Sequence, residues 1–184
     1  VCAQLSDRRN VIRSKQFPFR FLSAYRMLTG AATRYGNWET TPSVSFDVGR
    51  VLSALEDAML ASAENIPMFG GEKVKIASDV SGSMRHAISE NSTIQLYDVG
   101  LVLSMLLHNR CKRVITGLFG DNYLEVNLPK NGILENSMKM NKYANSVGYS
   151  TNGWKVIRDA REKRQELDRI MIFTDCQLWD SSSN

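Results

Sequence analysis

The sequence predicts an α/β fold in which helices flank a mostly parallel sheet and an α-helical segment precedes it. Residues 1–67 carry only helical periodicity. After Gly71, short apolar runs alternate with helical patterns, the order typical of crossover units in parallel sheets. Residues 169–174 include a continuous apolar run, as expected for a strand buried on both faces. We therefore expect a helical-repeat segment at residues 1–67 and an α/β domain at residues 68–184.

The first segment is expected to consist of short helices. Residues 5–28 predict two helices separated near Pro18, because proline does not fit inside a helix. Residues 36–42 read as a loop. Residues 48–59 carry apolar side chains at three- and four-residue steps, which predict an amphipathic helix. Proline and paired glycines in residues 66–71 mark the domain boundary.

The second segment is expected to alternate strands with helices. The expected order is strand 74–78, helix 94–106, strands 113–119 and 123–128, helices 137–145 and 152–166, and strand 169–174. The link Gly120-Asp121-Asn122 between the two middle strands has hairpin chemistry. Binding sites in parallel sheets form beyond the carboxyl ends of the strands, so polar residues at those ends are the first functional candidates.

Composition limits the class of protein. The chain has 184 residues, 43% of them hydrophobic, enough for one good core. No stretch approaches the roughly 20 apolar residues of a membrane span, and the first nine residues lack the charged-then-apolar order of a signal peptide. Three widely spaced cysteines without a C-x-x-C pair indicate neither a disulfide framework nor a zinc site, which favours a cytoplasmic protein. The missing initial Met and the end soon after a strand lead us to expect a fragment, truncated within the second domain.

The net charge of +4 is concentrated at the start of the chain. Residues 1–26 carry six Lys and Arg side chains and one acid, Asp7. This excess suggests an anionic partner for the helical segment, although a solvated helix face is the alternative. The side chains with the charge and spacing for phosphate contact in RNA are Arg8, Arg9, Arg13 and Lys15. Phe17, Phe19 and Tyr25 could stack on bases, but their helical spacing favours packing in the core.

The strand at residues 74–78 runs into a cluster of oxygen-bearing side chains. Asp79, Ser81 and Ser83 form a D-x-S-x-S pattern, and Gly82 allows the backbone to turn so that the oxygens converge. An N-cap with ordinary capping hydroxyls is the alternative for Asp79 alone. Asp175 follows the last strand in the same way, so in adjacent parallel strands the two carboxylates meet at one edge of the sheet.

A third contributor is Thr151, in the loop that opens the helix leading to the last strand. All five side chains offer oxygen, which suits magnesium, manganese or calcium and not zinc or copper, and few protein ligands with several waters is the magnesium pattern. Helix amino termini nearby favour an incoming anion. No residue has an assigned place as general base, so we expect a docking site for an acidic ligand and not an enzyme.

These residues resemble the metal-ion-dependent adhesion site (MIDAS) of von Willebrand factor A domains. There the first strand runs into D-x-S-x-S, and separate loops supply a Thr and an Asp, as the five oxygen-bearing residues do here in order. Upstream, Phe17-Pro18-Phe19-Arg20-Phe21-Leu22 and Asn65-Ile66-Pro67 resemble the end of the TROVE module of Ro-type RNA-binding proteins, in which a von Willebrand factor A domain follows.

The resemblance implies a non-enzymatic RNA-binding scaffold of a Ro-type ribonucleoprotein. In that family the TROVE ring binds small noncoding Y RNAs and single-stranded RNA ends for RNA quality control or decay, and in bacterial relatives Y-like RNAs tether an exoribonuclease. The alternative is a metal-dependent protein adhesion or assembly module without an RNA role. A phosphotransferase of the haloacid dehalogenase type would need a second Asp at the position of Ser81, and no P-loop motif occurs.

Overall fold

The computed structural model describes residues 1–30, 46–64, 66–90 and 92–177. The helices are α1 (Cys2–Leu5), α2 (Arg8–Ser14), α3 (Phe19–Leu28), α4 (Phe46–Ala63), α5 (Leu96–Arg110), α6 (Ile133–Tyr143) and α7 (Trp154–Glu162), with 3₁₀ turns η1 (Ser83–Arg85) and η2 (Ala144–Ser146). The strands are β1 (Phe69–Asp79), β2 (Cys111–Phe119), β3 (Tyr123–Glu125) and β4 (Arg169–Phe173). None of the described helices combines the length and hydrophobicity needed to span a membrane.

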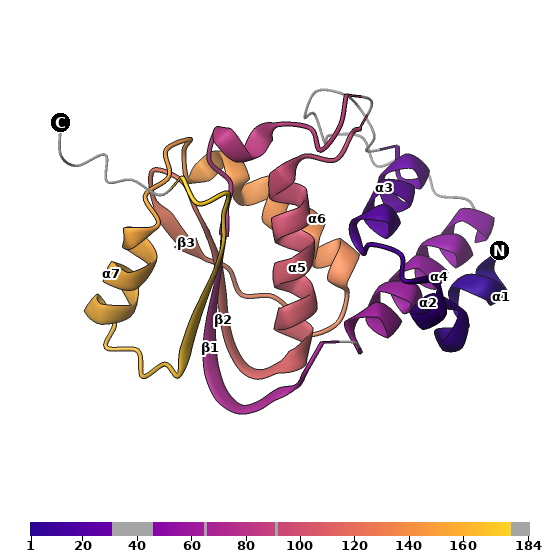
Figure 1. The fold of residues 1–184 in the computed structure, drawn as a ribbon, viewed down its shortest axis with the longest axis horizontal. Coiled ribbons are helices and arrows are strands. Elements are labelled where there is room, and N and C mark those ends of the chain that lie inside the picture. Colours follow the sequence, from indigo (N-terminus) through magenta and orange to yellow (C-terminus); the bar gives the residue numbers. More distant parts are fainter. Residues whose placement is uncertain (31–45, 65, 91, 178–184) are drawn as a thin grey trace.

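The strands form a mixed sheet in the order β3-β2-β1-β4. β1 is parallel to both β2 and β4, while β3 pairs antiparallel with β2 through the predicted hairpin. Figure 1 shows α7 on one face of the sheet and α5 and α6 on the other, with α1 to α4 beyond them. Crossover helices on both faces bury β1, whose residues 74–79 are buried throughout. The predicted α/β fold with a preceding helical segment is confirmed.

The helical segment begins with three short helices. The side chain of Asp7 caps α2 by accepting a hydrogen bond from the backbone nitrogen of Arg9, at 2.9 Å. Lys15 ends α2 in the left-handed conformation, with φ of 49°. Pro18 is the N-cap of α3, so the predicted break near this residue is confirmed. The loop predicted at residues 36–42 lies outside the described residues.

The helical segment shares one apolar core with one face of the sheet domain. Leu22 of α3 and Met59 of α4 are at most 1% exposed, as are Met105 of α5 and Leu134 of α6, and all four belong to the same buried cluster. The predicted boundary between residues 67 and 68 stays a prediction, because this core continues across it. Burial of this apolar surface is the main force holding α3 and α4 against α5 and α6.

Two polar contacts, one buried and one partly buried, hold the same helices together. The guanidinium of Arg26, on α3, forms a two-pronged ion pair with Asp98 of α5, with Nη1 2.7 Å from Oδ2. The Glu56 carboxylate of α4 accepts hydrogen bonds from the backbone nitrogens of Ile133 and Leu134, the latter at 3.0 Å. Glu56 thus caps α6 from a distant helix, which explains why α6 begins at Ile133 and not near residue 137 as predicted.

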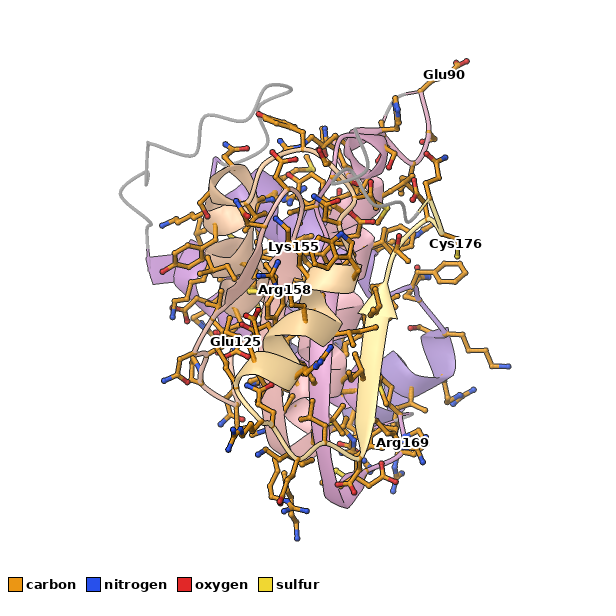
Figure 2. All side chains as sticks on the ribbon, turned by 90° about the vertical axis from the view of Figure 1, so that its left-hand side faces the viewer. Glu90, Glu125, Lys155, Arg158, Arg169 and Cys176 are labelled. Atoms are coloured by element: carbon orange, nitrogen blue, oxygen red, sulfur yellow. The ribbon has the colours of Figure 1, made fainter. Side chains whose placement is uncertain are left out.

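A charged network lies under α7 on the opposite face of the sheet. Lys75 of β1 is 0% exposed, and its Nζ is 3.0 Å from Oε1 of Glu125 on β3 and 2.7 Å from Oδ2 of Asp159 on α7. It also donates to Oε1 of Gln165 at 2.9 Å. Lys163 contacts the same two carboxylates from the solvent side. Figure 2 views the molecule from this face, with Glu125 beside α7.

Candidate metal centre at the carboxyl end of the sheet

Asp79 is the last residue of β1 and is 0% exposed. Its Oδ1 accepts a hydrogen bond from the backbone nitrogen of Ser81 at 2.9 Å, which folds the chain back over the strand end. Val80 donates its backbone hydrogen to the carbonyl of Phe119 at 3.1 Å and so anchors this turn to β2. The hydroxyls of Ser81 and Ser83 lie 3.2 Å apart. The structure therefore brings the three residues of the D-x-S-x-S pattern together.

The end of β4 lies beside Asp79 because the two strands are parallel and in register. Ser78 pairs with Phe173, so the next residue of each strand also lies side by side. The hydroxyl of Thr174 donates to Oδ2 of Asp79 at 2.7 Å. Asp175 follows directly, half-buried, and its Oδ1 accepts from the backbone nitrogen of Gln177 at 3.2 Å. Sequence reasoning missed Thr174, because its contact with Asp79 depends on the register of β4 against β1, which the sequence does not show.

The loop carrying Thr151 reaches the same end of the sheet. The backbone nitrogen of Gly82 donates to the carbonyl of Tyr149 at 2.8 Å, which joins this loop to the D-x-S-x-S turn. Thr151 is 6% exposed, and the backbone nitrogen of the next residue, Asn152, donates to the carbonyl of Gly120 at the end of β2 at 3.1 Å. Three strand ends and one loop thus meet in the region predicted for the site.

Asp121 positions this loop and was not predicted to take part. Its Oδ1 accepts from the backbone nitrogen of Ser150 at 2.8 Å, and its carbonyl oxygen accepts from the side chain of Asn152 at 3.1 Å. Hydrogen bonds from the side chain and backbone of Ser150 lower the pKa of the Asp121 carboxyl. Gly148 has φ of 82°, and a methyl group on it would lie 1.9 Å from Oδ2 of Asp121, so only glycine fits.

A cation stands at the rim of this region. The guanidinium of Arg85 lies 4.5 Å from the ring centroid of Tyr149 and 5.8 Å from that of Tyr97. Its Nη2 donates to Oδ1 of Asn145 at 3.1 Å. Tyr149 itself is 59% exposed. The rim therefore presents a positive charge and an accessible aromatic ring to any ligand that approaches the oxygen cluster.

The donor set suits a hard cation. It comprises the two carboxylates of Asp79 and Asp175 and three hydroxyls, with no nitrogen or sulfur among them. Within the described residues, no group of three or more His, Cys, Asp and Glu side chains could hold a metal ion, so a zinc-type site is not indicated. Thr151 and Asp175 form no hydrogen bond with the other three predicted ligands in the described residues. Which metal binds, and whether all five residues ligate it, stays a prediction.

The four basic residues predicted to contact phosphate all lie at the surface. Arg9, Arg13 and Lys15 are exposed. Arg8 is also exposed but forms an ion pair with Glu64 at the end of α4, with Nε 2.6 Å from Oε2. Hydrogen bonding to Glu64 raises the pKa of the Arg8 guanidinium. Part of the charge of Arg8 is therefore already neutralised, while the other three remain available to a ligand.

The sheet order and the oxygen cluster beyond β1 together define a von Willebrand factor A (vWA) domain. Residues 73–184 match the family model described as the Ro60 vWA domain, and the chain belongs to that family. The crystal structure of the Deinococcus radiodurans RO (RSR) protein is similar in fold, with a TM-score of 0.61 and 20% sequence identity. That match covers 97% of this chain and 34% of the other, so this chain spans about a third of that protein's length. The comparison with curated proteins found no match.

Proposed function

We propose that this chain is part of a non-enzymatic RNA-binding scaffold of the Ro type. In this proposal the helical segment contributes to binding of Y-like small noncoding RNA and of single-stranded RNA ends. The vWA domain docks an acidic protein ligand through a divalent cation, and an exoribonuclease is one partner that such a scaffold would recruit in RNA quality control or decay. The observation that carries the proposal is the oxygen cluster at the carboxyl end of the sheet, in a chain of the Ro60 vWA family.

The residues of the cluster have separate tasks in docking. Asp79, Asp175 and the hydroxyls of Ser81, Ser83 and Thr151 would hold the cation, which when bound supplies a positive centre for a carboxylate of the partner. Thr174 fixes the orientation of the Asp79 carboxylate by its 2.7 Å hydrogen bond. The described contacts around Asp79 include no residue placed to activate a water molecule, which supports docking over bond cleavage.

Metal binding is tested by thermal unfolding during titration with magnesium, manganese or calcium chloride. At a metal concentration of about 100 times Kd, the bound cation should stabilise the chain by about 2.7 kcal/mol. Asp79→Asn should abolish this gain, because it removes a buried charge from the donor set. Asp57→Asn is the matched control, since Asp57 is exposed and lies on α4. An equal response of wild type and Asp79→Asn would contradict a metal site here.

RNA binding is tested by measuring the affinity for a stem-loop RNA with single-stranded ends at several salt concentrations. Replacing the four predicted phosphate contacts by Gln should weaken binding and reduce the salt slope by up to about 2.8, at roughly 0.7 per phosphate contact. Because of its pair with Glu64, Arg8 should contribute least. The control variant removes four exposed cations elsewhere: Lys112, Lys142, Arg161 and Arg164. Equal losses in both variants would show that only net charge matters.

The same experiments separate this proposal from a protein adhesion module without an RNA role. A chain that responds to metal but binds no RNA would favour the adhesion module. Copurified RNA with the longer protein that contains this chain, sensitive to ribonuclease treatment, would favour the scaffold.

A further inference from the structure

An exposed aromatic ring stands at the start of α3. The side chain of Phe17 is 66% exposed, whereas Phe19, two residues later, is half-buried. The two rings are stacked, with centroids 5.6 Å apart and an interplanar angle of 13°. The prediction that Phe17 packs in the core is therefore wrong, because the turn before Pro18 turns its ring outward. Phe19 supports one face of the ring and fixes its orientation, so its accessible surface is already set for stacking.

The ring of Phe17 is surrounded in sequence by exposed cations. Arg9 and Arg13 lie one helical turn apart on α2, on the face opposite the buried Val11. Lys15 ends that helix two residues before Phe17, and Arg20 is exposed in the first turn of α3. Arg9 and Arg13 are separated by about 6 Å along the helix axis, at 1.5 Å per residue.

The acidic side chains that the structure describes leave these cations without an ion pair. Within the described residues, no ion pair involves Arg9, Arg13, Lys15 or Arg20. The two other arginines of this segment have partners, since Arg8 pairs with Glu64 and Arg26 is buried against Asp98. The surface formed by Arg9, Arg13, Lys15, Phe17 and Arg20 is called the Phe17 platform below.

We infer that Phe17 stacks on a nucleobase of single-stranded RNA while Arg13 and Lys15 contact the adjoining phosphates. An oriented aromatic ring beside uncompensated cations is the combination that binds single strands, because every base has a π face and every linkage a negative charge. A single exposed ring suits one base better than a lipid bilayer, which requires a broad apolar helix face. This inference rests on the proposed RNA-binding function, and it assigns to Phe17 the task of distinguishing single-stranded from paired RNA.

The test measures fluorescence anisotropy of labelled oligo(A), oligo(U) and a fully paired RNA duplex with the full chain. Phe17→Ala and Phe17→Leu should each weaken binding of the single strands by roughly 5- to 150-fold, the usual loss for one stacked base. The salt slope should stay unchanged, because no phosphate contact is lost. Phe17→Trp should retain the affinity, and duplex binding should not change in any variant. Met27→Ala is the matched control, since Met27 is 72% exposed and lies at the other end of α3.

Several outcomes would overturn the inference. Wild-type affinity in Phe17→Ala would do so while leaving RNA binding through the cations intact. Wild-type affinity in Phe17→Leu would show that an apolar side chain of any shape suffices. An equal loss on the duplex, or binding to phosphatidylserine vesicles that depends on Phe17 when RNA binding does not, would point to another ligand. If the wild-type chain binds none of the RNAs, the proposed function fails together with the platform.

Discussion

The neutral histidine near the end of α5 should make the stability of this chain depend on pH. His108 is 4% exposed, and its Nδ1 lies 2.8 Å from the hydroxyl of Thr116 on β2. Burial, and to a smaller extent the charge of Lys130, lowers the pKa of His108 from 6.5 to about 4. The folded state therefore holds the imidazole neutral at pH values at which the unfolded chain would protonate it.

The size and the sign of the effect follow from these two pKa values. At about 1.4 kcal/mol per pH unit, the difference corresponds to about 3 kcal/mol of unfolding free energy. Because the folded-state pKa is the lower one, this stability is fully present above the unfolded-state value of 6.5 and is lost as the pH falls toward 4. His108→Gln removes the titration but can still hydrogen-bond to Thr116.

Urea unfolding at a series of pH values between about 4 and 7.5 is the assay. The wild type should lose about 3 kcal/mol more than His108→Gln over this interval. His86→Gln is the control, since His86 is exposed and is the only other histidine. Burial raises the pKa of Glu56, which changes stability in the opposite direction, but this contribution is common to both proteins and cancels in the difference. Parallel pH profiles for the wild type and His108→Gln would refute the reasoning.

Two further changes test the buried ion pairs by urea unfolding at neutral pH. Lys75→Met should destabilise the fold by about 2–4 kcal/mol, since it leaves the carboxylates of Glu125 and Asp159 without their buried cation. The expected loss is moderate because both carboxylates are partly exposed to water. A triple variant that also carries Glu125→Gln and Asp159→Asn should recover part of the loss, and no recovery would contradict this explanation. Arg26→Met should cost about 3–5 kcal/mol, because Asp98 is 1% exposed and would be left as a buried charge without its cation. A loss below about 1 kcal/mol, as for a surface pair, would show that the two helices do not depend on this contact.

Local apolar runs were sufficient to locate three of the strands. The strands predicted at residues 74–78, 113–119 and 169–174 all appear. The expectation that the last of them is buried on both faces is wrong for the described residues, since Arg169 and Ile170 are exposed and the rest of β4 is half-buried. The helix predicted at residues 137–145 begins four residues earlier, where Glu56 caps it from 77 positions away in the sequence. The strand predicted at residues 123–128 ends at Glu125, since it pairs with β2 alone. Such ends depend on tertiary partners that no local pattern records.

In the candidate site, too, some features follow from the sequence and others depend on tertiary contacts. Asp79 and Asp175 could be placed together because parallel strands align their carboxyl ends, a rule that needs no coordinates. Thr174 and Asp121 could not, since their roles depend on the register of β4 and on a close backbone approach at Gly148. The exposure of Phe17 was likewise hidden, because helical spacing does not show which way the chain turns before a helix starts.

The Lys75 network has a mechanical consequence for the loop that precedes α7. A shift of α7 along its axis would carry Asp159 away from the fully buried ammonium group of Lys75 and remove one of its two carboxylate partners. The ion pair between Lys75 and Asp159 thus holds α7 against β1, the strand that ends in Asp79. The loop with Thr151, which leads into α7, and the Asp79 carboxylate are therefore both held by β1, so a ligand would meet two parts of the candidate metal centre that do not move independently.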